Sequence, residues 1–86
     1  MRTHAEIDTI VRDIQSKLNA RHLAGGPDLR IPPDGFSEED DWLNVIVEPA
    51  GPGVRAYQYV QTLGDVEKEL RADGMRHVLL LPAVAD

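Results

Sequence analysis

The feature that most constrains this chain is a strand–helix–strand pattern between positions 42 and 83. Two apolar runs, Trp42–Glu48 and Val78–Leu81, are typical of β-strands. Between them the spacing predicts an amphipathic helix over Pro52–Asp73, with Pro52 at its first position and Gly74 as a left-handed cap. Two strands joined by a helix are parallel in nearly all such units. The pattern therefore predicts a sheet with a helix packed on it.

The segment 54–60 leaves an alternative open, because Val54–Val60 could also form a strand paired with the first apolar run. At about 100° per residue, a helical projection gathers one mainly apolar arc of roughly 120°. Its members are Ala56, Tyr59, Val60, Leu63, Val66 and Leu70, and Glu67 is the one charged residue among them. Gly64 costs about 1 kcal/mol relative to Ala in a helix. If the helix breaks at Gly64, Val54–Val60 becomes a strand.

The N-terminal segment predicts a helix over Thr3–His22. Thr3 and Glu6 fit a capping box, in which their side chains satisfy free backbone N–H groups. The residues that follow form one apolar stripe, made of Ile7, Ile10, Val11, Ile14 and Leu18. The run Gly25-Gly26-Pro27 ends this helix.

The region 24–41 is predicted to be mostly irregular. It contains a short candidate strand, Leu29–Ile31, and a turn at Asp34-Gly35. The acidic run Ser37–Asp41 is interpreted as a solvent-facing loop.

The element order is thus α-β-β-α-β in a single domain over residues 1–86. It predicts an α+β two-layer sandwich, with a small three-stranded mixed sheet and two helices on one face. With both helices on one face of this small sheet, the other face has no covering layer. Trp42 and Ile46 are therefore expected on an uncovered face, available to a partner copy.

Composition excludes several chemistries. The absence of cysteine excludes disulfides, thiolate metal ligands, iron–sulfur clusters held by cysteine and thiol catalysis. The net charge of −6 disfavours nucleic acid and favours a basic partner, if any. Neither a signal core nor a membrane-spanning run is recognisable. We expect a cytoplasmic protein with no cofactor and no bound metal.

Few residues are candidates for a site. The turn that contains Gly51, Gly53 and Arg55 could hold an anion at a helix N-terminus, although it matches neither phosphate-loop motif. Tyr57 is predicted to point outward beside Arg71, and an exposed aromatic–arginine pair of this kind is a hint of an interface. Glu67 is anomalous within its apolar arc, where it could pair with an arginine or mark a groove.

The α-β-β-α-β order is similar to that of the small scaffold domains of iron–sulfur assembly and to KH-like RNA-binding folds. The scaffold domains depend on a C-x-x-C pair, and this chain has no cysteine. KH-like folds need a G-x-x-G loop with basic flanks, which Gly51-Pro52-Gly53 does not supply. Neither activity is implied for this chain.

The sequence predicts a small non-enzymatic interaction or regulatory protein that acts through a protein partner or as a homodimer. Trp42, Ile46, Tyr57 and Glu67 are the candidate interface residues. The alternative is a small-ligand or anion-binding domain that uses the Gly51–Arg55 turn. For a third class, a small enzyme, the candidates are Arg55, Glu67 and His77.

Overall fold

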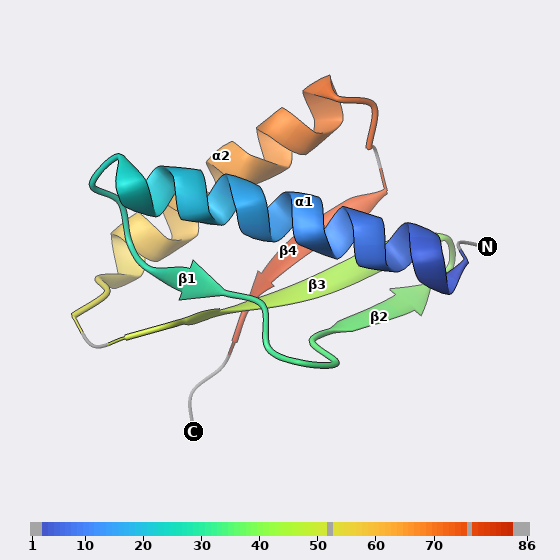
Figure 1. Ribbon diagram of the computed structural model, residues 1–86, viewed down its shortest axis with the longest axis horizontal. Coiled ribbons are helices and arrows are strands. Elements are labelled where there is room, and N and C mark those ends of the chain that lie inside the picture. The colour runs from blue at the N-terminus through green and yellow to red at the C-terminus, as the bar shows by residue number, and fades with distance from the viewer. Residues whose placement is uncertain (1–2, 52, 76, 84–86) are drawn as a thin grey trace.

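The computed structural model describes residues 3–51, 53–75 and 77–83, which form two helices and four strands (Figure 1). The elements in chain order are α1 (His4–Leu23), β1 (Leu29–Arg30), β2 (Phe36–Glu39), β3 (Trp42–Pro49), α2 (Ala56–Ala72) and β4 (Val78–Pro82). The class is α+β, as predicted, but the sheet has four strands rather than three. Within the described residues, neither helix has the length and apolar character needed to cross a membrane.

Strand β3 is the centre of the sheet and pairs with the other three strands. Its partners β1 and β2 are antiparallel to it, whereas β4 is parallel. Backbone N–H groups alternate between the two edges of a strand. The Ile46 N–H bonds to Gly35 O and the Ala50 N–H to Asp28 O, whereas the Leu43 N–H bonds to His77 O. Strands β2 and β1 therefore follow one another along one edge of β3, and β4 occupies the other edge.

The acidic run predicted as a loop is instead largely strand β2, so that prediction is wrong. Phe36 lies opposite Val45 and Glu39 lies opposite Trp42 in an antiparallel ladder. The connection is only two residues long, because Asp40 and Asp41 both adopt left-handed backbone conformations with φ of 49° and 69°. Such a pair closes a tight hairpin whose twist matches that of the strands. The ladder hydrogen bonds to β3 outweigh the preference of the acidic side chains for a loop.

Both helices cover the same face of the sheet (Figure 1). On that inner face Leu43, Val45 and Val47 of β3 are completely buried. The other buried hydrophobic residues of the core are Ile7, Ile14, Leu18, Leu29, Tyr59, Leu63, Val66, Leu70, Val78 and Leu80. The two-layer arrangement follows from this one-sided burial.

Helix α1 forms close to where the sequence predicts it. The Thr3 hydroxyl accepts a hydrogen bond from the Glu6 N–H at 3.1 Å, which satisfies one free donor of the first turn. At the other end, Gly25 has a φ of 97° and donates to His22 O, while Gly26 donates to Arg21 O. This is a Schellman cap. A Cβ on Gly26 would lie 2.8 Å from Arg21 O, so only glycine fits there.

Helix α2 begins four residues later than predicted, at Ala56 rather than at position 52. Pro52 itself lies outside the described residues. The alternative strand over residues 54–60 is wrong, because Tyr59 already donates its N–H to Arg55 O in the first helical turn. The predicted arc also differs from the buried face: Ala56 and Val60 are exposed and Thr62 is buried. The helix inclines its Leu63 side toward the sheet, which leaves the Val60 side in solvent.

The C-terminal end of α2 confirms the predicted glycine cap. Gly74 has a φ of 91° and donates to Arg71 O, and Met75 donates to Leu70 O. These two bonds form a second Schellman cap. It turns the chain directly toward β4.

Ion pairs connect the two helices across their solvent side. Arg21 Nη2 lies 2.7 Å from Glu69 Oε1, and its Nη1 lies 3.6 Å from Asp65 Oδ2. Lys17 Nζ lies 3.2 Å from Asp73 Oδ2, and this hydrogen bond raises the pKa of Lys17 above its ordinary value. Such half-exposed pairs orient α1 on α2 more than they stabilise it.

Tyr59 joins α2 to the ends of both parallel strands. Its hydroxyl donates to Val47 O on β3 and accepts from the Ala83 N–H just beyond β4, at 3.0 Å. The Ala83 N–H also lies 3.0 Å from Val47 O, so the three groups form one cluster. Burial raises the pKa of the Tyr59 hydroxyl above its ordinary value of 10.0, with a smaller contribution from the negative charge of Glu48.

Candidate functional site: the outer face of the sheet

The face of the sheet opposite the helices carries a set of exposed apolar side chains. Alternation along β3 places Trp42 and Ile46 on this outer face, where they are 36% and 39% exposed. On β4 the same alternation places Leu79 and Leu81 there, half-buried and 41% exposed. Leu81 is the parallel-register partner of Ile46, and Leu79 is the partner of Asn44. We call Trp42, Ile46, Leu79 and Leu81 the outer-face patch.

Polar groups lie within and beside the outer-face patch, where Asn44 of β3 lies between Trp42 and Ile46. The Arg30 Nε lies 2.7 Å from Glu48 Oε1, which closes an ion pair across β1 and β3. The Trp42 ring is tilted by 48° against the His77 imidazole, with 5.1 Å between the ring centroids. Exposed apolar side chains next to polar groups are common in protein–protein interfaces.

The outer face is close to electrically neutral. Of the strand residues that alternate onto it, Arg30 is positive and Glu39 and Glu48 are negative, so their formal sum is −1. The whole chain carries −6. Most of the negative charge therefore lies on other surfaces, and electrostatic repulsion between two outer faces is weak.

The predicted residues Trp42 and Ile46 lie together on the outer face, but Tyr57 and Glu67 do not join them. Tyr57 is on α2 and 61% exposed. It shares a helix face with Arg71 but is separated from it along the axis by about 21 Å, at 1.5 Å per residue, so the two cannot pair. Arg71 instead pairs with Glu67, whose Oε2 lies 3.3 Å from Arg71 Nη2.

Glu67 lies at the free edge of β4. Its Oε1 accepts a hydrogen bond from the backbone N–H of Leu80 at 3.3 Å, and its side chain is only 18% exposed. The anomaly in the sequence pattern is thus explained by a backbone group of the sheet. Glu67 belongs to the edge of the sheet rather than to its outer face.

The turn proposed for anion binding lies further from the start of α2 than the sequence predicts. Arg55 is the N-cap residue, with extended backbone and no side-chain cap, and Gly53 has a φ of 86°. Gly51 and Gly53 therefore precede the helix by several residues instead of opening it. The free N–H groups belong to residues 56–58, behind Arg55. Anion binding by the Gly51–Arg55 turn therefore remains a prediction. The two glycines do not form the N-terminus of α2.

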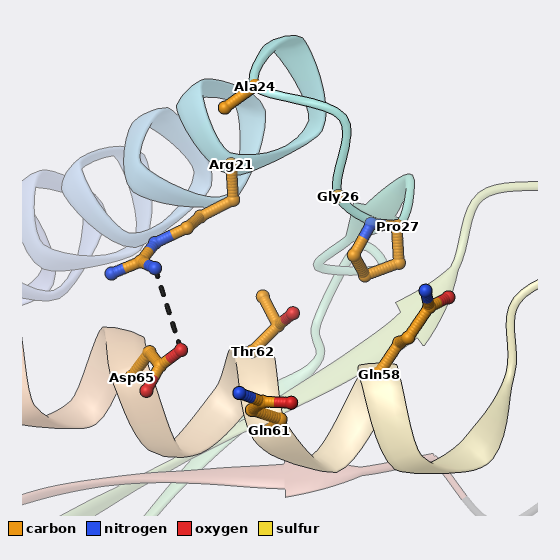
Figure 2. A pocket seen from close by; sticks show the side chains of 8 residues that line it. All are labelled: Arg21, Ala24, Gly26, Pro27, Gln58, Gln61, Thr62 and Asp65. Carbon is orange, nitrogen blue, oxygen red and sulfur yellow. Dashed lines mark ion pairs between the residues drawn. The ribbon is translucent and has the colours of Figure 1, made fainter.

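A shallow groove of about 270 Å³ lies between the end of α1 and the first half of α2 (Figure 2). Figure 2 shows Arg21, Gln58, Gln61, Thr62 and Asp65 pointing into it from the two helices, beside the turn of Ala24, Gly26 and Pro27. The Arg21 guanidinium is already paired with carboxylates of α2. Its charge is matched within the fold, and the groove is not a preformed anion site. None of Gly51, Gly53 and Arg55 lines it.

Metal binding has no geometric support in the part of the chain that the structure describes. Within residues 3–51, 53–75 and 77–83, no three His, Asp or Glu side chains converge on one point. The acidic hairpin, interpreted above as a loop, spreads its carboxylates along a strand and a turn.

Sequence reasoning missed Leu79 and Leu81, because the run Val78–Leu81 is uniformly apolar and shows no alternation. Such a continuous run predicts a buried strand beneath helices and does not indicate which of its residues face outward. The signal that could have found them is the size of the sheet: two helices of 20 and 17 residues can cover only one face.

Comparison of the chain with protein-family models, curated proteins and solved structures finds no match. Inference about function therefore starts from the outer-face patch and its surroundings.

Proposed function

We propose that this protein is a small non-enzymatic interaction module that associates with a second copy of itself through the outer face of its sheet. The observation that supports this proposal most directly is the outer-face patch: Trp42, Ile46 and Leu81 are exposed on one face, where Ile46 and Leu81 are neighbours across the strands, while the opposite face is closed by two helices. Burial of such side chains contributes about 25 cal/mol per Å².

A second copy fits this face better than a strongly charged partner does. The formal charge of −1 on the outer face permits two identical faces to meet without strong repulsion. The face also carries one residue of each sign in Arg30 and Glu48, so a twofold axis could bring the Arg30 of each copy near the Glu48 of the other.

The size of the face sets the expected strength of association. At ~4.8 Å between strands and ~3.3 Å per residue, three strand positions and eight residues give a face of roughly 14 by 26 Å. Two such faces bury less than the ~1,200–2,000 Å² of stable complexes. We therefore expect a weak, reversible dimer in the micromolar range or above.

The test is the mass in solution as a function of concentration, measured by sedimentation equilibrium. The wild-type protein should pass from the 9.5 kDa of one chain toward twice that mass. Ile46→Lys, at a solvent-exposed position of the central strand, should remain a single chain. Val60→Lys is the matched control, because Val60 is a 62% exposed β-branched residue on α2 and the substitution adds the same charge.

Trp42 supplies a second readout, because it is the only tryptophan of the chain. Its emission should shift to shorter wavelength as the protein concentrates, and should not shift in Ile46→Lys. A wild-type protein that stays at single-chain mass with a constant Trp42 emission would remove the second copy as the occupant of this face.

A further inference from the structure

The free edge of β4 is a second surface through which two copies could join, by continuing their sheets. Consecutive residues of a strand direct their backbone groups to opposite edges. His77 O and the Ala83 N–H both bond to β3. By alternation, the backbone groups of Val78, Leu80 and position 82 face away from β3. This outward row could template an added strand.

Two features of the chain occupy this row. Position 82 is Pro82, which has no backbone N–H. The Leu80 N–H, in the middle of the row, already donates to Glu67 Oε1 at 3.3 Å. Among the described residues of β4, only Val78 still directs a backbone N–H outward.

Glu67 is well placed to keep an added strand away. Its second oxygen lies 3.3 Å from Arg71 Nη2, one turn further along α2, so the carboxylate is held at both oxygens. The carbonyl oxygen of an incoming strand would have to replace a carboxylate oxygen at Leu80, next to the same negative charge. Inward-pointing charges at sheet edges are a known means of preventing edge-to-edge pairing.

We propose that Glu67 closes the β4 edge and thereby restricts which surface of this protein can associate. Without Glu67, β4 pairs with the β4 of a second copy in antiparallel register about a twofold axis, through Val78 and Leu80. This inference concerns the edge of the sheet and does not depend on association through the outer-face patch.

The experiment uses the Ile46→Lys background, in which association through the outer face is removed. Adding Glu67→Ala should give twice the single-chain mass at concentrations where Ile46→Lys alone stays at one chain. Glu69→Ala in the same background is the matched control: it removes a carboxylate from the same helix, and Glu69 contacts Arg21 rather than β4. It should leave the mass unchanged.

A local readout makes the result independent of mass. In dilute protein, the amide proton resonance of Leu80 should move upfield in Glu67→Ala, because it loses its carboxylate acceptor. Glu67→Gln retains an acceptor oxygen, so it should stay at single-chain mass, and its Leu80 amide resonance should stay close to the wild-type position. If Glu67→Ala does not fold, Glu67→Ser tests the same point, since serine is too short to reach Leu80.

Two results would overturn the proposal. One is an unchanged Leu80 resonance in a folded Glu67→Ala or Glu67→Ser protein. The other is that the same variant in the Ile46→Lys background stays at single-chain mass, as Glu69→Ala does. Failure of the outer-face proposal would look different. In that case wild type and Ile46→Lys would have the same mass, while the Glu67 variants would still report on the edge.

Discussion

At the scale of single residues, Tyr59 connects α2 to both of the parallel strands. Its hydroxyl contacts Val47 O and the Ala83 N–H, and so fixes the ends of β3 and β4 relative to the helix that joins them. Tyr59→Phe should lower the free energy of unfolding by about 1 kcal/mol, the net worth of a typical hydrogen bond. The loss should stay modest, because Val47 O keeps the Ala83 N–H as a partner. Urea unfolding at pH 7 measures it, and an unchanged midpoint would contradict the assigned contacts.

The same residue predicts a dependence on pH. Burial raises the pKa of Tyr59 in the folded state above 10.0. Above pH 10, the unfolded chain loses the phenolic proton while the folded chain retains it, so stability falls as pH rises toward the folded pKa. Tyr59→Phe lacks this component. The stability difference between wild type and Tyr59→Phe should therefore be full at pH 8 and shrink above pH 10, and a constant difference would contradict the raised pKa.

At the scale of elements, α2 and its cap offer two glycines whose replacement should have opposite effects. Gly64 lies inside the helix, and a Cβ added there would meet nothing within 4 Å, so Gly64→Ala should stabilise the protein by about 0.5–1 kcal/mol. Gly74 has equally open space but a φ of 91°. Gly74→Ala should destabilise by about 1 kcal/mol, because alanine is strained in the left-handed region. Thermal unfolding of the two variants, compared with wild type, checks both signs. A loss of stability in Gly64→Ala would contradict the open space around Gly64.

Elements were predictable where one local pattern decides the conformation. The capping box and apolar stripe located α1 to within a residue at each end. The β2 hairpin was not predictable in this way, because its evidence is a ladder with β3 and a two-residue turn built from Asp40 and Asp41 rather than from glycine. The start of α2 was misplaced because Gly51 and Pro52 resemble a helix start by themselves. The helix instead begins at Ala56, after the N-cap residue Arg55, which has no side-chain cap to signal a helix start.

The candidate site was predictable in part for the same reason. Trp42 and Ile46 alternate with buried Leu43, Val45 and Val47, so their placement on one face followed from the strand period. Glu67 was singled out by its position in an apolar arc. Its partner, the Leu80 N–H, lies 13 residues away and could be found only from the pairing of β4 with β3.

At the scale of the whole molecule, net charge and the outer-face patch act in opposite directions on self-association. Each copy carries −6, so two copies repel at long range, whereas the patch attracts only on contact. Raising the salt concentration from about 0.01 M to about 1 M shortens the Debye length from ~30 Å to ~3 Å. Screening removes most of the repulsion and leaves the burial of Trp42, Ile46 and Leu81 intact.

We therefore expect the dimer dissociation constant to fall as salt rises. Sedimentation equilibrium of the wild type over this salt range measures the change, and Ile46→Lys should remain a single chain throughout. Association with a basic protein, the other partner predicted from the charge, would change in the opposite sense, since screening weakens attraction between opposite charges. The sign of the salt dependence thus separates association driven by the outer-face patch from association driven by net charge. Wild-type self-association that weakens with salt would place the contact elsewhere, on a surface where opposite charges meet.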